Sequence, residues 1–290
     1  MTIIERAIQA ARAKAASTSA ATASAGEPPA RPARGAGRVM PLPRPTHDSP
    51  DQVIPFPRFE ADGSLVTEVT DPKVYEQFRR LKRPLLQCAF GPLATPGTQT
   101  IMITSPLQGA GKTFISSNLA YALALEKDRN VLLIDTDNAN PTLTRQMGLI
   151  GRPGLYDLIS DTALTLEQVV CRTDIPGLWI LPAGKTAPDS LELLNSHRCQ
   201  EIFRQLADRD PDGIIILDAP PLLITNEAPA VTVLAGQFLL VVESGVTPKS
   251  SVTRALGMLD AKKPIGLVLN KARGHNELGS YYPTYPYPAA

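Results

Sequence analysis

The sequence is poor in cysteine, in aromatic residues and in net charge, and it contains no long apolar run. It has 290 residues, three cysteines, 5% aromatic residues and a formal net charge of +1. Cys88, Cys171 and Cys199 form no C-x-x-C pair, which argues against a disulfide framework and a cysteine-rich zinc site. No run of about 18 apolar residues occurs, and the N-terminus lacks the apolar run of a signal peptide. We therefore expect a cytoplasmic chain that does not itself cross a membrane.

Charge is unevenly distributed along the chain. Residues 1–58 hold eight basic and four acidic side chains, and the remainder carries a small excess of acid. This balance gives no reason to expect nucleic acid as a main partner. A mildly basic N-terminal arm either keeps the protein soluble or rests on an anionic membrane surface, and both readings stay open.

The N-terminal fifth of the chain reads as a helix followed by a linker. Ile3, Ile4, Ala7, Ile8 and Ala11 recur at helical spacing, which predicts an amphipathic helix over residues 1–16. This helix docks either on a protein or on a membrane surface. Residues 17–58 have no periodicity and are rich in alanine and proline, so they are predicted to be a linker without a packed core.

The remainder predicts one α/β domain preceded by a helix. The stretch "DPKVYEQFRRLKRPLL" has Asp71 as its N-cap and Pro72 at its first position, and is predicted to end at Pro84. From residue 99, apolar runs such as "TIMITS", "VLLID", "GIIILD", "QFLLVV" and "IGLVLN" alternate with helical segments near 111–127, 189–208 and 248–261. Runs this apolar suit strands covered on both faces, which predicts a mostly parallel sheet with flanking helices over residues 99–272.

The first apolar run leads into "SPLQGAGKTF", which has the pattern of a phosphate-binding P-loop. Its glycines let backbone N–H groups approach phosphates, and the following helix N-terminus adds partial positive charge. Lys112 is predicted to reach the β and γ phosphates and Thr113 to bind Mg²⁺. Pro106 replaces the first glycine of the usual pattern. The predicted nucleotide-binding residues are Gly109, Ala110, Gly111, Lys112, Thr113 and Phe114, with Asn270 in "LVLN" either contacting adenine or serving as a turn residue.

Three aspartates end two other apolar runs. Asp135 and Asp137 lie in "VLLIDTDNANP", and Asp218 lies in "IIILDAPP". Open parallel sheets bind ligands at the carboxyl ends of their strands, so these side chains are expected beside the P-loop. Phosphoryl transfer needs charge neutralisation and a group that takes the acceptor's proton, and Mg²⁺ prefers oxygen ligands. The sequence therefore predicts a P-loop NTPase site with ATP and Mg²⁺ as cofactors.

Together, "GAGKT", "LLIDTDNANP" and "IIILDAPP" resemble the motifs of bacterial Walker-type tyrosine kinases from capsule and exopolysaccharide loci. The likeness runs from about Glu68 to the C-terminus, and "IIERAI", "FRRLKRPLL" and "LPAG" are similar to the branch found beside exosortase systems. The resemblance implies ATP-dependent autophosphorylation of a neighbouring subunit's tail in a ring. It implies Asp135 as proton acceptor from the tyrosine, and Asp137 and Asp218 as Mg²⁺ ligands with Thr113. It also implies a membrane polysaccharide co-polymerase and a tyrosine phosphatase as partners, with location at the inner membrane through a partner.

The resemblance also implies an oligomer contact and exposes two departures. The family's E-x-x-R-x-x-R helix corresponds to Glu76, Arg79 and Lys82, in the predicted oligomerisation segment 59–98, although a solvated helix with internal ion pairs is the simpler alternative. Ala139 stands where the family has an arginine, which leaves open a nucleotide-binding regulatory or scaffold protein. A partitioning-type ATPase is disfavoured because Leu107 stands where that class carries a second lysine.

The C-terminal tail, residues 273–290, gathers tyrosines in "SYYPTYPYP". Tyr281, Tyr282, Tyr285 and Tyr287 are the predicted phosphoacceptors, against the alternative of a low-complexity interaction strip. The interleaved prolines disfavour a helix and favour an extended chain that a cleft accepts. Four phosphates would add roughly −6 to −8 charges, so phosphorylation is predicted to dissociate an oligomer.

Overall fold

The computed structural model describes residues 53–55, 65–127 and 129–272. All of them belong to one compact unit, Val39–Ala290. The predicted helix over residues 1–16, most of the predicted linker and the whole tail from residue 273 lie outside the described residues.

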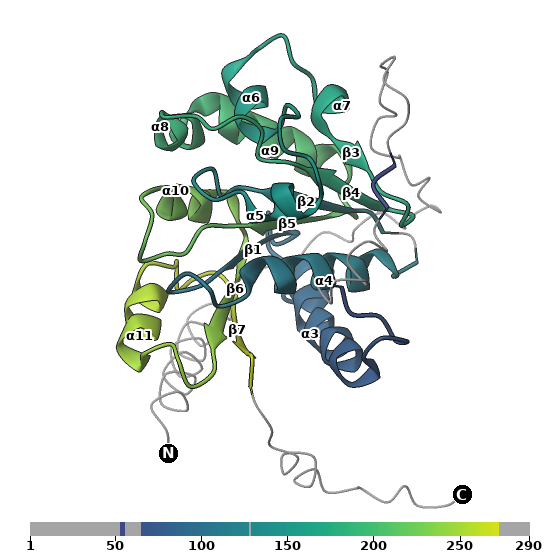
Figure 1. Ribbon diagram of the computed structural model, residues 1–290, viewed down its shortest axis with the longest axis vertical. Helices are drawn as coiled ribbons and strands as arrows, with labels where there is room; N and C mark the ends of the chain where they lie inside the picture. Colours follow the sequence, from purple (N-terminus) through teal and green to yellow (C-terminus); the bar gives the residue numbers. More distant parts are fainter. Residues whose placement is uncertain (1–52, 56–64, 128, 273–290) are drawn as a thin grey trace, which may run out of the picture. The chain divides into compact units, whose positions relative to one another are not determined.

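A seven-stranded sheet runs through the described chain in the order β3-β4-β2-β5-β1-β6-β7 (Figure 1). The strands are β1 (Thr100–Thr104), β2 (Val131–Asp135), β3 (Cys171–Arg172), β4 (Leu178–Leu181), β5 (Ile214–Asp218), β6 (Gln237–Glu243) and β7 (Ile265–Asn270). Every neighbouring pair is parallel except β3 with β4. The predicted α/β fold is therefore confirmed, and among the strands of the described chain only the two-residue β3 was not predicted.

Helices cover both faces of this sheet, which explains why its central strands are uniformly apolar. The helices are α3 (Pro72–Phe90), α4 (Lys112–Ala124), α5 (Thr142–Gln146), α6 (Leu155–Ser160), α7 (Leu166–Val169), α8 (Ser190–Asn195), α9 (His197–Arg209), α10 (Glu227–Leu234) and α11 (Lys249–Gly257). Along β1, Ile101 and Ile103 pack in the core under α3 and α4, whereas Met102 joins the opposite core with α6, α9 and α10. The alternation places one apolar layer on each side of the sheet.

Helix α3 begins as predicted but does not end at Pro84. The Asp71 carboxylate accepts hydrogen bonds from the N–H groups of Lys73 and Val74, both 3.1 Å long, and so caps the helix. Pro84 lies on the exposed side of the helix, and the buried Leu85 and Ala89 beyond it pack in the core. Burying a leucine side chain contributes about 2 kcal/mol and burying an alanine methyl group about 1 kcal/mol, together comparable to the ~3 kcal/mol that an interior proline costs. The helix therefore continues to Phe90, and the prediction was wrong at this end.

The single helix predicted over 189–208 is two helices. α8 ends before Ser196, whose backbone is extended, and the Ser196 hydroxyl accepts a hydrogen bond of 3.1 Å from the N–H of Cys199. Serine is a favoured N-cap because its oxygen replaces a missing helical acceptor. The sequence reading treated Ser196 as an interior residue and therefore missed the break.

Part of the predicted linker is packed. Ile54 is 4% exposed and forms an isolated parallel bridge with Thr173, beside β3. The N–H of Ile54 donates to the carbonyl oxygen of Arg172, and its own carbonyl accepts from the N–H of Asp174. The prediction of a linker without packed residues was wrong at Ile54, because this residue belongs to the same buried apolar cluster as residues of α3 and α4.

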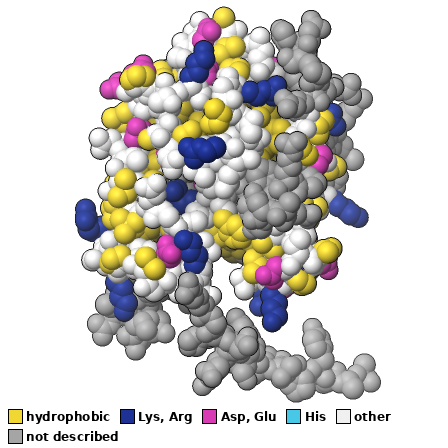
Figure 2. All heavy atoms as spheres, in the orientation of Figure 1, with side chains coloured by type: hydrophobic (Ala, Val, Ile, Leu, Met, Phe, Trp, Pro, Cys, Tyr) yellow, Lys and Arg dark blue, Asp and Glu magenta, His cyan; other side chains and the backbone are white. Residues whose placement is uncertain are grey.

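The visible surface carries interspersed charges. Figure 2 shows Lys and Arg side chains scattered over the face in view, with acidic side chains among them. Among the described residues, no helix is both long enough and apolar enough to span a bilayer.

Candidate nucleotide and magnesium site

The loop between β1 and α4 has the backbone of a phosphate-binding loop. Gly109 and Gly111 have φ angles of 87° and 91°, a region that a β-carbon disfavours. Helix α4 starts at Lys112 without a side-chain cap. Its first N–H groups therefore point out of the helix end, where the helix dipole favours an anion.

The carbonyl side of this loop is held by the end of β7. Asn270 Nδ2 donates to the carbonyl oxygen of Ala110 over 2.8 Å, and Lys271 Nζ donates to that of Gly109 over 2.7 Å. Lys271 also pairs with Glu243 at 3.1 Å. With the carbonyl oxygens engaged on this side, the loop is fixed in the form that presents N–H groups to a ligand.

The contact with adenine predicted for Asn270 stays a prediction. In this structure the side-chain amide nitrogen of Asn270 binds the P-loop instead. No role for Lys271 was predicted from the sequence. Its position directly after a predicted strand end, next to an asparagine already under consideration, was the available signal.

Asp218 lies at the end of β5 against the first turn of α4. Thr113 Oγ1 donates to Asp218 Oδ2 over 2.7 Å, and Ser116 Oγ donates to Oδ1 over 3.0 Å. Burial raises the pKa of Asp218 to about 6, although the bond from Thr113 and the charge of Lys112 oppose this. The structure thus brings together the predicted hydroxyl and carboxylate ligands of Mg²⁺ from two distant segments.

Asp135 is the register partner of Asp218 across β2 and β5. Its Oδ2 accepts from the N–H of Thr144 at 2.8 Å and from Thr144 Oγ1 at 2.7 Å, and its Oδ1 accepts from the N–H of Asp137 at 3.1 Å. Burial, and then the neighbouring Asp218 carboxylate, raise the pKa of Asp135 to about 7. A carboxylate offers about four acceptor positions, so these three bonds leave one position of the fully buried Asp135 without a donor among them.

Asp137 is the more open of the two aspartates in this loop. One oxygen accepts from the N–H of Asn140 at 3.0 Å. Burial raises its pKa, and the nearby positive charge of Lys112 lowers it. Lys112 therefore lies close enough to act on both Asp137 and Asp218, as the P-loop prediction requires.

The loop after Asp137 receives a guanidinium from helix α5. Ala139, where the resembling family has arginine, is exposed and offers only a methyl group. Arg145 Nη2 instead donates to the side-chain oxygen of Asn140 over 3.2 Å. A positive charge thus lies beside the loop, although it comes from a different position in the chain.

The donor set fits Mg²⁺ together with a nucleotide. Among the described residues there is no group of three or more His, Cys, Asp or Glu side chains that would hold a metal ion alone. Mg²⁺ in nucleotide sites typically takes one or two carboxylates and completes its shell with water and phosphate oxygens. Thr113, Asp137 and Asp218 supply such hard oxygens.

The predicted oligomer contacts on α3 are partly occupied within the chain. Glu76 pairs with Arg79 at 3.1 Å and with Arg80 at 3.5 Å on the exposed side of the helix. Lys82 has a side chain only 13% exposed; it pairs with Glu126 and donates to the carbonyl oxygen of Ala122 over 3.0 Å. Lys82 thus ties α3 to the end of α4, and the oligomer contact itself stays a prediction.

Comparison with known proteins also indicates a nucleotide-binding domain, and its relatives include tyrosine-protein kinases. Residues 101–284 match the family model described as the CobQ/CobB/MinD/ParA nucleotide binding domain. Tyrosine-protein kinase YwqD of Bacillus subtilis is 31% identical over 188 residues, 63% of this chain and 77% of that protein. Tyrosine-protein kinase ptk of Acinetobacter johnsonii is 29% identical over 61% of this chain, which spans only 24% of that longer relative. The solved BceF tyrosine kinase domain superposes with a TM-score of 0.59 at 29% identity, over 72% of this chain and 86% of that one. The chain belongs to the CobQ/CobB/MinD/ParA nucleotide-binding family, among its bacterial tyrosine-protein kinases.

Proposed function

We propose that the chain is an ATP-dependent protein-tyrosine kinase that phosphorylates the tyrosines of its own C-terminal tail, from one subunit to a neighbour within an oligomer. The supporting observation is the convergence of Lys112 and Thr113 with Asp135, Asp137 and Asp218 at one edge of the sheet. The acceptors are Tyr281, Tyr282, Tyr285 and Tyr287.

Each side chain has a task that follows from its place. Lys112 would neutralise phosphate charge, and Thr113, Asp137 and Asp218 would hold Mg²⁺, which would supply further positive charge during phosphoryl transfer. Asp135 takes the phenol proton at its remaining acceptor position while the γ-phosphoryl group passes to the phenol oxygen and ADP leaves. A free phenol has a pKa near ~10 and is hardly ionised at neutral pH, so a base with a raised pKa suits the transfer.

The cellular role we propose is the regulation of exopolysaccharide synthesis or export. A membrane polysaccharide co-polymerase would recruit the chain to the inner membrane from the cytoplasm, and a tyrosine phosphatase would reverse the modification. Support for this part comes from the kinase relatives and from the motifs shared with polysaccharide-locus enzymes.

One observation favours a second function, a nucleotide-binding regulator with weak or no kinase activity. Ala139 leaves the Asp137 loop without the guanidinium that the resembling family carries at that position. Arg145, which reaches the same loop through Asn140, is a candidate substitute. An Arg145→Ala variant that loses phosphotransfer but still binds nucleotide would show that Arg145 fills the role.

The test is incubation of the purified chain with Mg²⁺ and ATP, followed by detection of phosphotyrosine. Lys112→Met is expected to reduce the signal at least 100-fold, whereas Lys262→Met, a matched change of an exposed lysine on the far loop, leaves it unchanged. A chain ending at Ser280 should lose the signal. Wild type no more phosphorylated than Lys112→Met would refute the kinase function, and a signal that survives the truncation would refute the tail as acceptor.

The oligomer is tested by its mass in solution before and after phosphorylation. Each phosphate adds about −1.5 to −2 charges, and the subunits should therefore repel one another. The assembly formed by the fully phosphorylated protein should have a lower mass in solution than the assembly in the same sample after phosphatase treatment. An assembly of constant mass would contradict the predicted dissociation.

A further inference from the structure

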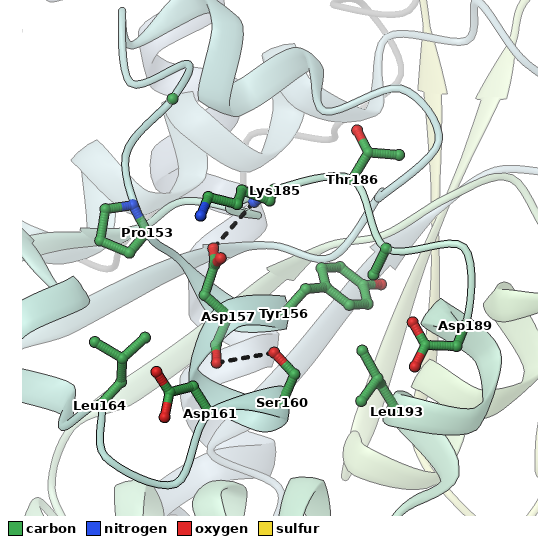
Figure 3. Close-up of a pocket in the computed structure, with 12 residues that line it drawn as sticks. Pro153, Tyr156, Asp157, Ser160, Asp161, Leu164, Lys185, Thr186, Asp189 and Leu193 are labelled. Carbon is green, nitrogen blue, oxygen red and sulfur yellow. Dashed lines mark hydrogen bonds between the residues drawn. The ribbon is translucent and has the colours of Figure 1, made fainter.

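A cavity of about 610 Å³ lies at the edge of the described domain where β4 ends. Figure 3 shows its walls: Tyr156 and Ser160 on α6, Leu164 after it, and the loop from Lys185 to Asp189 that follows β4. Its volume is in the range of ~300–1,000 Å³ that is typical of small-ligand sites. None of the nucleotide or metal residues lines it, so it is a separate site.

The cavity shares its wall with the Asp135–Asn138 segment. The Tyr156 hydroxyl donates to the carbonyl oxygen of Thr136 over 2.9 Å. Asn138 and Ala187 exchange two hydrogen bonds, from Asn138 Nδ2 to the Ala187 carbonyl at 2.8 Å and from the Ala187 N–H to Asn138 Oδ1 at 3.2 Å. A ligand in the cavity therefore lies against residues that hold the Asp135–Asn138 segment through Thr136 and Asn138.

The lining combines apolar and polar groups in a way that suits an uncharged aromatic peptide. Pro153, Leu164 and Leu193 provide apolar walls and Ser160 provides a hydroxyl, whereas Tyr156 borders the cavity but is only 1% exposed. An extended proline-rich segment loses little conformational entropy when it binds such a groove. From residue 280 to 290 the chain's own tail is rich in tyrosine and proline and has no charged side chain.

We infer that this cavity, the tail pocket, binds a Tyr-Pro segment of the C-terminal tail and thereby presents an adjacent tyrosine to Asp135, an inference that rests on the proposed kinase function. Neighbouring tyrosines are one to three residues apart, so the next tyrosine lies roughly 3–10 Å along an extended segment from the one that the pocket holds.

The charges of the tail pocket favour the substrate over the product. Asp157, Asp161 and Asp189 contribute three carboxylates against the single ammonium of Lys185. Asp157 is engaged by the N–H groups of Gly154 and Lys185, both at 3.0 Å. A phosphotyrosine brings about −1.5 to −2 charges and would be repelled by this rim. The pocket thus releases a segment once it is phosphorylated.

The tail is long enough to reach the pocket of its own chain. The described chain ends after β7, five strands along the sheet from β4. At ~4.8 Å per strand this is about 24 Å. The nine residues from Ala272 to Tyr281 span up to about 30 Å when extended, and Tyr287 reaches up to about 50 Å.

The test uses the full-length chain with its four tail tyrosines replaced by serine, which removes the competing internal ligand. The probe is a fluorescein-labelled peptide of residues 278–290, with and without phosphate on Tyr285, and anisotropy gives its Kd. Ser160→Trp, which fills the pocket, is expected to weaken binding of the unmodified peptide at least tenfold and leave the Kd of Mg-ADP within twofold. Thr162→Trp, on the exposed turn outside the lining, is the matched control and should change neither.

A second variant tests the charge argument without filling the pocket. Asp189 is exposed and makes no capping hydrogen bond, so Asp189→Lys should fold normally and bind the phosphorylated peptide at least fivefold more tightly. No peptide binding, or equal binding by Ser160→Trp, would overturn the inference. Pocket-dependent binding without phosphate transfer from ATP would instead refute the proposed function and leave the tail site in place.

Discussion

Replacing Thr144 by valine tests whether the structure holds Asp135 as described. Thr144 is 1% exposed and follows Asp135 by nine residues, on α5. Its hydroxyl donates to Asp135 Oδ2 over 2.7 Å and accepts from the N–H of Ala183 over 2.9 Å. Valine has nearly the same shape but neither donates nor accepts, so the change isolates the two hydrogen bonds.

The magnitude follows from these bonds. The bond to an ionised carboxylate is worth about 1.5–3 kcal/mol, and an unsatisfied buried N–H costs about 1–3 kcal/mol. Because the N–H of Thr144 still donates to Asp135, we expect Thr144→Val to lower the free energy of unfolding by about 2–4 kcal/mol at pH 8. Losing the hydroxyl raises the pKa of Asp135 further above about 7. At pH 5 the carboxyl is protonated in the folded wild type, so the expected loss falls to about 1–2 kcal/mol.

The assay is urea unfolding of the full chain at pH 5 and pH 8, with Thr144→Ser as the control that keeps the hydroxyl. The same proteins are then compared for kcat and KM of phosphotransfer. Thr144→Ser should recover most of both stability and kcat. Equal destabilisation of Thr144→Val at the two pH values, or a serine variant as impaired as the valine variant, would refute this account of Asp135.

Three further outcomes are expected. Gly111→Ala should weaken nucleotide binding more than Gly109→Ala does, as measured by calorimetry. Both glycines have a positive φ, but only the β-carbon at Gly111 would displace Asn270 Nδ2 from its bond to the loop, whereas the one at Gly109 meets no atom within 4 Å. Lys82→Met should lower the free energy of unfolding by about 1–2 kcal/mol, against less than about 0.5 kcal/mol for the exposed Arg79→Met. Lys82 is mostly buried and would lose its bond to the Ala122 carbonyl as well as its pair with the partly exposed Glu126. Equal effects in urea unfolding would contradict this. Asp135 and Asp218, the two buried carboxylates at the strand ends, have raised pKa values, so they lower the stability of the apoprotein as pH rises from about 4 to 7. The increase in melting temperature caused by Mg-ADP should therefore be larger at pH 8 than at pH 5. The reverse trend would count against a carboxylate site.

The strand and loop motifs were predictable because they depend on local pattern. Uniformly apolar runs identify strands that are covered on both faces, and the spacing of Gly109, Gly111 and Lys112 identifies a loop whose backbone only glycine allows. Parallel strands end at a common edge, which is why Asp135 and Asp218 could be expected together before any coordinates were known.

The structure differs from the sequence-based prediction at Pro84, Ser196 and Ile54. The sequence predicts a helix end at Pro84 because an interior proline is costly, but the burial of Leu85 and Ala89 offsets that cost. The sequence predicts helix interior at Ser196 although its cap on Cys199 is local, because a single continuous helix was the simpler pattern. The packing of Ile54 could not be predicted, because its bridge to Thr173 joins distant segments.

What the sequence alone determined is the fold class, the P-loop and the identity of the chemical groups, because apolar periodicity and glycine conformation act within a few residues. Only the tertiary structure decided which side chains position these groups. Thr144 binds Asp135, Lys271 binds the P-loop, and Asn138 binds Ala187 in the wall of the tail pocket. These contacts join segments 9, 162 and 49 residues apart, respectively. They form because the folding of the sheet brings strand ends together, and no local pattern in the chain encodes that proximity.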